Sequence, residues 1–144
     1  MPKPTKTIKI IIDTNWWISL ILSKNSSGLP EFVLDERIVI CFSDELKREI
    51  LTVLTYKHVA GKINRENLLR IDEYLNSVAT FFNVTSEITI CPDPKDNFLL
   101  SLANDAKADY LLTADPDLLN IKQFNITIIC SVKDFADLYY QNSL

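Results

Sequence analysis

Runs of apolar residues follow two different spacings along the chain, and each spacing predicts one type of element. Continuous apolar runs occur at Ile8–Ile12, at Ile38–Phe42 and at residues 110–113 and 126–130. Such runs are typical of parallel strands that are buried on both faces of a sheet. Between them, apolar residues recur every three or four positions, which predicts amphipathic helices. The pattern therefore predicts strands that alternate with helices.

The helical segments begin at recognisable capping residues. Ser43 is a favourable N-cap, and Asp93-Pro94 and Asp115-Pro116 each place an aspartate before a proline at a helix start. Gly61 separates two consecutive helices, the second of which carries an apolar stripe that extends to Phe82. Helices are predicted at residues 15–22, 29–34, from Ser43 to about Lys57, along the stripe from Leu68 to Phe82, at 96–107, briefly after Pro116, and at Val132–Tyr140.

The order of these elements predicts the fold class. Strands separated by one or more helices form parallel sheets with helices packed on the faces. We therefore expect a three-layer α/β/α sandwich with a central, mostly parallel sheet. The 144 residues contain no repeat, no low-complexity tract and no linker, so we expect a single domain over residues 1–144.

Composition places the chain among cytoplasmic globular proteins. Apolar residues make up 47% of the chain, which is enough for one core, yet no apolar run approaches the length of a membrane span. The basic N-terminus lacks the apolar region of a signal peptide. Cys41, Cys91 and Cys130 lie far apart in or beside apolar runs, which indicates buried free thiols in a reducing compartment.

The charge balance limits how this chain could bind nucleic acid. The net charge is −4 and the isoelectric point is about 4.9, which argues against a broad basic surface. A local basic patch and an acidic site that works through metal ions both remain open. His58 is the sole histidine, so mechanisms that need a histidine pair are excluded.

Four carboxylates are the candidate catalytic residues. Asp13 and Asp115 follow two predicted strands, and sites in open α/β sheets lie beyond the carboxyl ends of the strands. Asp96 begins the helix that leads into the second of these strands, so it should lie at the same edge. Glu49 lies between the apolar stripe and the solvent face of its helix, about 60° from Leu46, so it can reach over the rim of the core.

Bare carboxylates in one cleft repel each other, and a hard divalent cation relieves that repulsion. Mg²⁺ favours oxygen ligands and keeps several waters, and Mn²⁺ is a possible substitute. Such an ion can deprotonate a water and stabilise the leaving oxygen of a phosphodiester. Taken singly, each acid has a simpler explanation, because Asp13 and Asp115 suit N-caps and Asp96 suits a helix start. Their joint order and spacing favour a metal site.

The same residues carry a resemblance to a known family. The string IIIDTNWWISLIL resembles the opening of a PIN domain, FSDELKREILTVL resembles its second acidic helix, and CPDPKDNFLLSLANDAKADYLLTADPDLL is similar to its signature segment. The subgroup that these strings resemble is that of the bacterial and archaeal toxin components similar to VapC. The resemblance implies a Mg²⁺- or Mn²⁺-dependent endoribonuclease, a homodimer or higher oligomer, and a protein antitoxin as partner.

The resemblance also implies roles for particular residues. Asp13, Glu49, Asp96 and Asp115 would be the catalytic, metal-binding acids, and the supporting polar residues would be Asn15, Thr113 and Asp117. The chain departs from the family pattern at Ala114, where a glycine is common, at Lys95, where many relatives carry an acid, and at Trp16-Trp17, a bulky pair. None of these departures removes a carboxylate, but they leave the substrate preference open.

Basic residues near Glu49 form a second candidate site. Lys47, Arg48 and Lys57 lie along the predicted helix and could contact the phosphates of RNA beside the acids. The alternative is an ordinary solvated helix face.

Two other classes of function compete with the nuclease. A phospho-receiver domain also carries acids at strand ends, but Ile11-Ile12-Asp13 lacks the required acidic pair and Cys130-Ser131 lacks the required lysine. A phosphatase with Asp-x-Asp after the first strand is disfavoured because position 15 is Asn. A non-catalytic regulatory or binding module with the same fold remains open, since only an assay distinguishes it.

Overall fold

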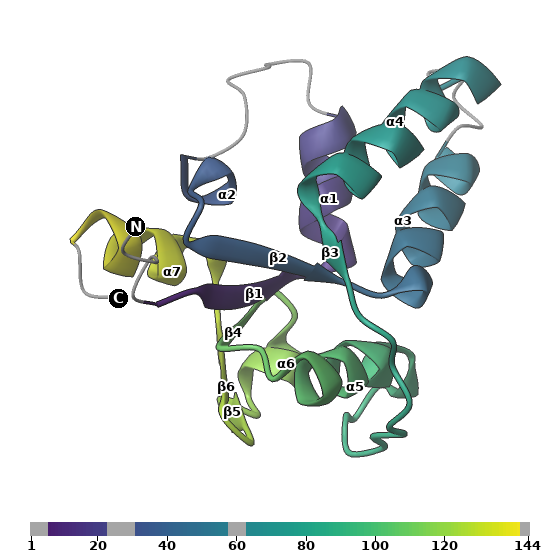
Figure 1. Ribbon diagram of the computed structural model, residues 1–144. Helices are drawn as coiled ribbons and strands as arrows, with labels where there is room; N and C mark the ends of the chain where they lie inside the picture. The colour runs from purple at the N-terminus through teal and green to yellow at the C-terminus, as the bar shows by residue number, and fades with distance from the viewer. Residues whose placement is uncertain (1–5, 23–30, 58–62, 142–144) are drawn as a thin grey trace.

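The computed structural model describes residues 6–22, 31–57 and 63–141 and contains a six-stranded sheet with helices on both faces (Figure 1). The helices α1, α3 and α4 lie together on one side, and α5 and α6 lie on the other. The elements in chain order are β1 (Ile8–Ile12), α1 (Thr14–Leu22), α2 (Glu31–Leu34), β2 (Ile38–Phe42), α3 (Asp44–Lys57), α4 (Arg65–Val78), β3 (Thr80–Phe81), the 3-10 turn η2 (Pro94–Asp96), α5 (Asn97–Ala106), β4 (Tyr110–Leu112), α6 (Pro116–Leu119), β5 (Gln123–Phe124), β6 (Thr127–Cys130) and α7 (Val132–Tyr140).

The sheet is mostly parallel, as the sequence predicts. The strand order is β3-β2-β1-β4-β6-β5, and only β5 runs antiparallel to its neighbour. The strands β1 and β4 are adjacent and parallel, with Ile12 opposite Leu112. The residues that follow these two strands therefore emerge side by side at one edge of the sheet.

The hydrophobic core fills the space between the sheet and its helices, and β1 and the start of α1 lie at its centre. Ile10, Ile11 and Ile12 are fully buried, as expected for a strand with helices on both faces. Trp17 is also fully buried, and its indole Nε1 donates a 3.0 Å hydrogen bond to the carbonyl of Ile12. Its ring packs edge-to-face on Phe42 at 5.4 Å. These contacts fix the turn between β1 and α1, which carries Asp13.

The predicted N-caps are confirmed. The Ser43 Oγ accepts a 3.1 Å hydrogen bond from the backbone N–H of Leu46 at the start of α3. Asp93 accepts one from the N–H of Lys95, and Asp115 accepts one from the N–H of Asp117. Each bond satisfies a helix donor that has no partner within the helix.

The prediction that the long helix extends to Phe82 is wrong. The helix α4 ends at Val78, and Thr80 and Phe81 instead pair with Cys41 and Phe42 as strand β3. Residues 79–82 have a pattern that suits either a helix or a strand, and pairing with the edge of β2 decides between the two. Residues 29 and 30 of the predicted second helix, together with His58 and Gly61, lie outside the described residues.

The cysteines are free thiols, as the sequence indicates. All three cysteines are free, and Cys41 and Cys91 are buried while Cys130 is half-buried. Burial raises the pKa of the Cys41 thiol to about 12. Across residues 6–22, 31–57 and 63–141, no helix combines the length and the apolar character needed to cross a membrane.

Candidate active site

Asp13 lies at the carboxyl end of β1, beside the end of β4. Its backbone N–H donates to the carbonyl of Leu112 at 2.9 Å, which continues the ladder between the strands by one residue. The hydroxyl of Thr113 donates a 2.6 Å hydrogen bond to the Oδ2 of Asp13. Both side chains are buried, with exposed fractions of 8% for Asp13 and 3% for Thr113. The pairing of β1 with β4 therefore holds this carboxylate in one orientation.

Asp115 is connected to Asp13 through the same hydroxyl. The Thr113 Oγ1 accepts a 3.0 Å hydrogen bond from the backbone N–H of Asp115 while it donates to Asp13. The Asp115 Oδ1 accepts from the N–H of Asp117 at 2.9 Å, which caps α6. One carboxylate oxygen of Asp115 is thus used for the fold, and the other oxygen is left for the site.

Asp96 is the last residue of η2 and directly precedes α5. Its Oδ2 is buried and has no hydrogen-bond partner among the described residues. Burial raises the pKa of Asp96 to about 7, and repulsion from the nearby carboxyl of Asp115 adds to the shift. A buried carboxylate oxygen without a donor is costly, so a bound cation or a proton would satisfy this atom.

Asp13, Asp96 and Asp115 lie close enough for the charge of one to change the pKa of another. Burial raises the pKa of Asp13, with a smaller contribution from the charge of Asp115, while the Thr113 hydrogen bond opposes the shift. The charges of Asp13 and Asp93 also contribute to the raised pKa of Asp96. The predicted convergence of Asp13, Asp96 and Asp115 at one edge of the sheet is therefore seen in the structure.

The donor set fits a hard divalent cation, although the side chains do not form a closed cage as they stand. Within the described ranges, no group of three or more histidine, cysteine or acidic side chains is arranged to hold an ion. The oxygen ligands present are carboxylates, and the Oδ2 of Asp96 has no other partner. Mg²⁺ binds in proteins through one or two carboxylates and several waters, so it needs no protein cage.

The remaining predicted residues lie around these three acids. Asn15 is exposed at the start of α1, and its backbone N–H bonds to the carboxylate of Asp13. Asp117 is half-buried in the first turn of α6. Glu49 is exposed on α3, one helical turn after Glu45. The structure thus groups Asn15 and Asp117 with the site and leaves Glu49 on the surface.

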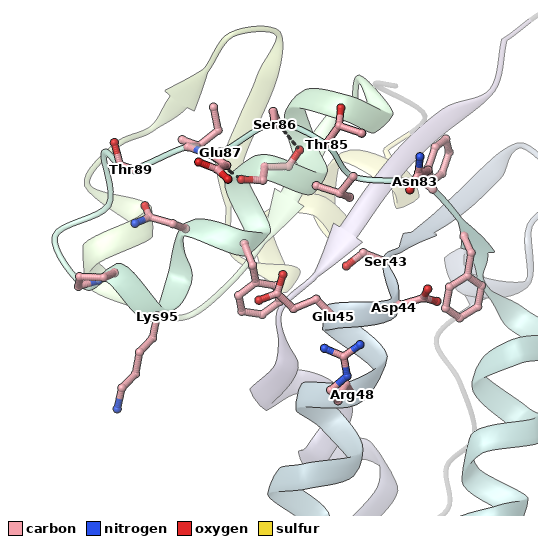
Figure 2. A pocket seen from close by; sticks show the side chains of 18 residues that line it. Ser43, Asp44, Glu45, Arg48, Asn83, Thr85, Ser86, Glu87, Thr89 and Lys95 are labelled. Atoms are coloured by element: carbon pink, nitrogen blue, oxygen red, sulfur yellow. Dashed lines mark hydrogen bonds between the residues drawn. The ribbon is translucent and has the colours of Figure 1, made fainter.

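Two hollows adjoin the acids. A cavity of about 500 Å³ is bounded on one side by Asp13, Thr113 and Asp115 and on the other by residues of α1, α6 and α7. A larger open groove of about 870 Å³ runs between the start of α3, the extended segment 81–89 and the start of α5 (Figure 2). Pro94, Lys95 and Asn97, which flank Asp96, line this groove.

The predicted basic residues differ in their surroundings. Arg48 lines the groove on α3 with Glu45 beside it, and Lys95 lies across from them (Figure 2). Lys47 instead pairs with Asp72 of α4 at 3.0 Å and contacts the Phe81 ring at 5.5 Å. Lys57 ends α3, and its side chain lies outside the described residues. Arg48 and Lys95 are therefore the groove's cations, while Lys47 joins two helices.

Two acids near the site were not among the predicted functional residues. The sequence predicts Asp93 only as an N-cap, yet its charge contributes to the raised pKa of Asp96. Glu45 lines the groove one helical turn before Glu49. The three-residue spacing of Asp93 and Asp96, which places them on one turn, was the signal available in the sequence.

Comparisons with known proteins agree with this geometry. The family model described as PIN domain matches residues 9–117, which include Asp13, Glu49, Asp96 and Asp115. The chain is 31% identical over 127 residues to a protein of Methanocaldococcus jannaschii named Uncharacterized protein MJ1680, covering 82% of this chain and 77% of that protein. No solved structure matches the chain with statistical significance. The chain belongs to the PIN domain family, whose members are generally nucleases.

Proposed function

We propose that the protein is a metal-dependent endoribonuclease whose active site is formed by Asp13, Asp96 and Asp115. One observation supports this most strongly. Three carboxyls meet at the carboxyl edge of the sheet, and one buried oxygen among them, Oδ2 of Asp96, has no partner in the described part of the chain. A catalytic cation explains this arrangement, because its positive charge would offset both the repulsion between the carboxylates and the cost of burying them.

Mg²⁺, or Mn²⁺ in its place, is the proposed cofactor. Asp13, Asp96 and Asp115 would hold it, and Glu49 is proposed as a further acid that acts once substrate is bound. When bound, such an ion lowers the pKa of a water and offsets charge on the phosphate. Thr113 would support the site through its two hydrogen bonds, which fix the carboxylate of Asp13 relative to the backbone of Asp115.

The proposed reaction is the hydrolysis of a phosphodiester bond. The oxygen of a water forms a bond to phosphorus, a bridging P–O bond breaks, and the departing oxygen takes up a proton. The carboxylates of Asp13 and Asp96 orient that water by accepting its hydrogen bonds. Asn15 and Asp117 are proposed to support the site, through the backbone bond to Asp13 and through the start of α6.

RNA is the proposed substrate, and the groove of Figure 2 is its proposed path to the acids. Arg48 and Lys95 would contact phosphates there, beside a site that is acidic until metal is bound. The biological setting follows from the resemblance to VapC: a cytoplasmic toxin, active as a homodimer or larger assembly and inhibited by a protein antitoxin. Growth arrest on expression, relieved by Asp13→Asn, would support this setting.

The test is cleavage of a labelled single-stranded RNA, with single-stranded DNA as comparison. We expect cleavage in Mg²⁺ or Mn²⁺, none in EDTA, and a loss of about a hundredfold or more in Asp13→Asn and Asp96→Asn. Asp137→Asn is the matched control, because it removes only an exposed ion pair with Lys133. Undiminished cleavage in EDTA or in Asp96→Asn contradicts the proposal. RNA binding without cleavage under every metal condition indicates a non-catalytic binding module instead.

A further inference from the structure

We propose that the 500 Å³ cavity beside the acids binds the base of a nucleotide next to the cleaved phosphate, with Trp16 as its stacking surface. The inference rests on the proposed function and specifies how that site would select its substrate. It depends on where the two adjacent tryptophans of α1 lie, on what lines the cavity, and on how close the cavity is to the acids.

Trp16 and Trp17 have different environments. Trp17 is fully buried, donates to the Ile12 carbonyl and packs on Phe42, so the fold requires it. Trp16 is only partly buried and lines the cavity. Consecutive helix residues point about 100° apart, which is why one indole enters the core and the other faces the cavity. Trp16 therefore packs against the edge of the core with part of its surface and presents another part to the cavity.

The ring of Trp16 is held in place. It contacts Trp17 edge-on, with the ring centroids 5.0 Å apart and an angle of 85° between the planes. Since Trp17 is fixed in the core, this contact restricts the orientation of Trp16. A planar aromatic surface held beside a reaction centre suits a nucleobase, because every base has a π-face that can stack on it.

The lining of the cavity favours a neutral, planar occupant. Pro116 and Val132 contribute apolar surface, while Ser19 and Ser131 provide hydroxyls that can bond to the edge of a base. The lining is otherwise neutral or acidic, so an isolated phosphate is disfavoured there. The volume lies in the range of small-molecule pockets, roughly 300–1,000 Å³.

The position of the cavity identifies which base it would take. Asp13 and Asp115 form one side of it, so an occupant lies directly beside the carboxylates that act on the phosphate. Only a nucleotide adjacent to the cleaved bond can place its base there. The cavity would then bind the base on one side of the cleaved bond, and the groove would bind the RNA on the other side of that bond.

The experiment combines variants of Trp16 with abasic RNA. A short single-stranded RNA is selected from a random pool by binding, and an abasic residue is placed at each position in turn. Binding is measured by fluorescence anisotropy in Ca²⁺, and cleavage is measured separately in Mg²⁺. We expect one abasic position to weaken binding and slow cleavage by the wild type about tenfold to a hundredfold. Trp16→Ala should show a similar loss on intact RNA and little further loss on that abasic RNA.

Two variants serve as controls. Trp16→Phe keeps an aromatic face and should retain most of the effect, while Tyr140→Ala removes an exposed aromatic at the end of α7 and should change nothing. If Trp16→Ala and the abasic position each weaken RNA binding and their effects multiply when combined, the two act independently. That result overturns the inference, even if RNA is cleaved. Coupled losses in binding without any cleavage uphold the base pocket and overturn the proposed nuclease. If RNA is neither bound nor cleaved, both are overturned.

Discussion

The hydroxyl of Thr113 donates a 2.6 Å hydrogen bond to the Oδ2 of Asp13, although the two residues are 100 positions apart in the sequence. The same oxygen accepts from the N–H of Asp115. This single side chain therefore ties together the ends of β1 and β4, the two strands that place acids at the site.

Replacing Thr113 by valine should reduce both stability and activity. Valine keeps the shape but removes the donor to a buried carboxylate, which costs about 1–3 kcal/mol of unfolding free energy. Loss of a residue that orients a metal ligand typically costs about tenfold to a hundredfold in activity or metal affinity. Chemical denaturation and RNA cleavage measure the two effects. Thr113→Ser should restore most of both, and a fully active Thr113→Val would contradict this role.

Asp96→Asn should stabilise the metal-free protein while abolishing cleavage. Burial and Asp115 raise the pKa of Asp96 to about 7, well above its ordinary value. The folded state therefore binds the proton more tightly than the unfolded state, and stability increases as the pH falls from about 7 toward 4. In EDTA, the melting temperature of the wild type should rise by a few degrees over that range. The rise should be smaller in Asp96→Asn, and an equal rise in both proteins would show that Asp96 is not its source.

Asp105 should stabilise the extended segment that lines the groove. It accepts hydrogen bonds from the backbone N–H groups of Thr85 and Ser86, which lower its pKa to about 2. A lowered pKa gives a contribution that is present above the ordinary aspartate range and is lost as the pH falls toward 2. Asp105→Asn should therefore destabilise the protein most at pH 7 and clearly less at pH 2–3, where the carboxylate begins to take up a proton. Denaturation at both pH values tests this, and an equal effect at both would contradict it.

The basic residues in and beside the groove should separate into two groups in RNA binding. Arg48→Ala and Lys95→Ala should each reduce the slope of log affinity against log salt by about 0.7, the value for one phosphate contact on a single strand. Lys47→Ala should leave the slope unchanged, because Lys47 is paired with Asp72 and Asn76. Its main effect should be a loss of less than about 1 kcal/mol in stability. A slope that falls only with Lys47→Ala would reverse this assignment.

The sequence predicts the acids at the sheet edge because local features determine them. The β-branched run before Asp13 and the apolar run before Thr113 favour strands through their own composition. Parallel pairing then brings the ends of the two strands together. The aspartate–proline pairs locate the starts of η2 and α6 without knowledge of the rest of the fold.

Other features depend on contacts that a local pattern does not contain. Thr80 and Phe81 form β3 because the edge of β2 offers backbone partners, whereas their spacing alone also suits a helix. Strand β5 is only two residues long and is connected to β6 through Asn125, which has a positive φ of 53°. The different roles of Trp16 and Trp17 likewise depend on the packing of α1 against β2, which two identical adjacent letters do not reveal.

The central claim is that Asp13, Asp96 and Asp115 form a site for a divalent cation. Titration of the protein with Mn²⁺, followed by electron paramagnetic resonance, measures this without any substrate. We predict saturable binding by the wild type and by Asp137→Asn, and affinity lower by about tenfold or more in Asp96→Asn. Equal affinity in the wild type and Asp96→Asn, or no saturable binding by the wild type, would contradict the account.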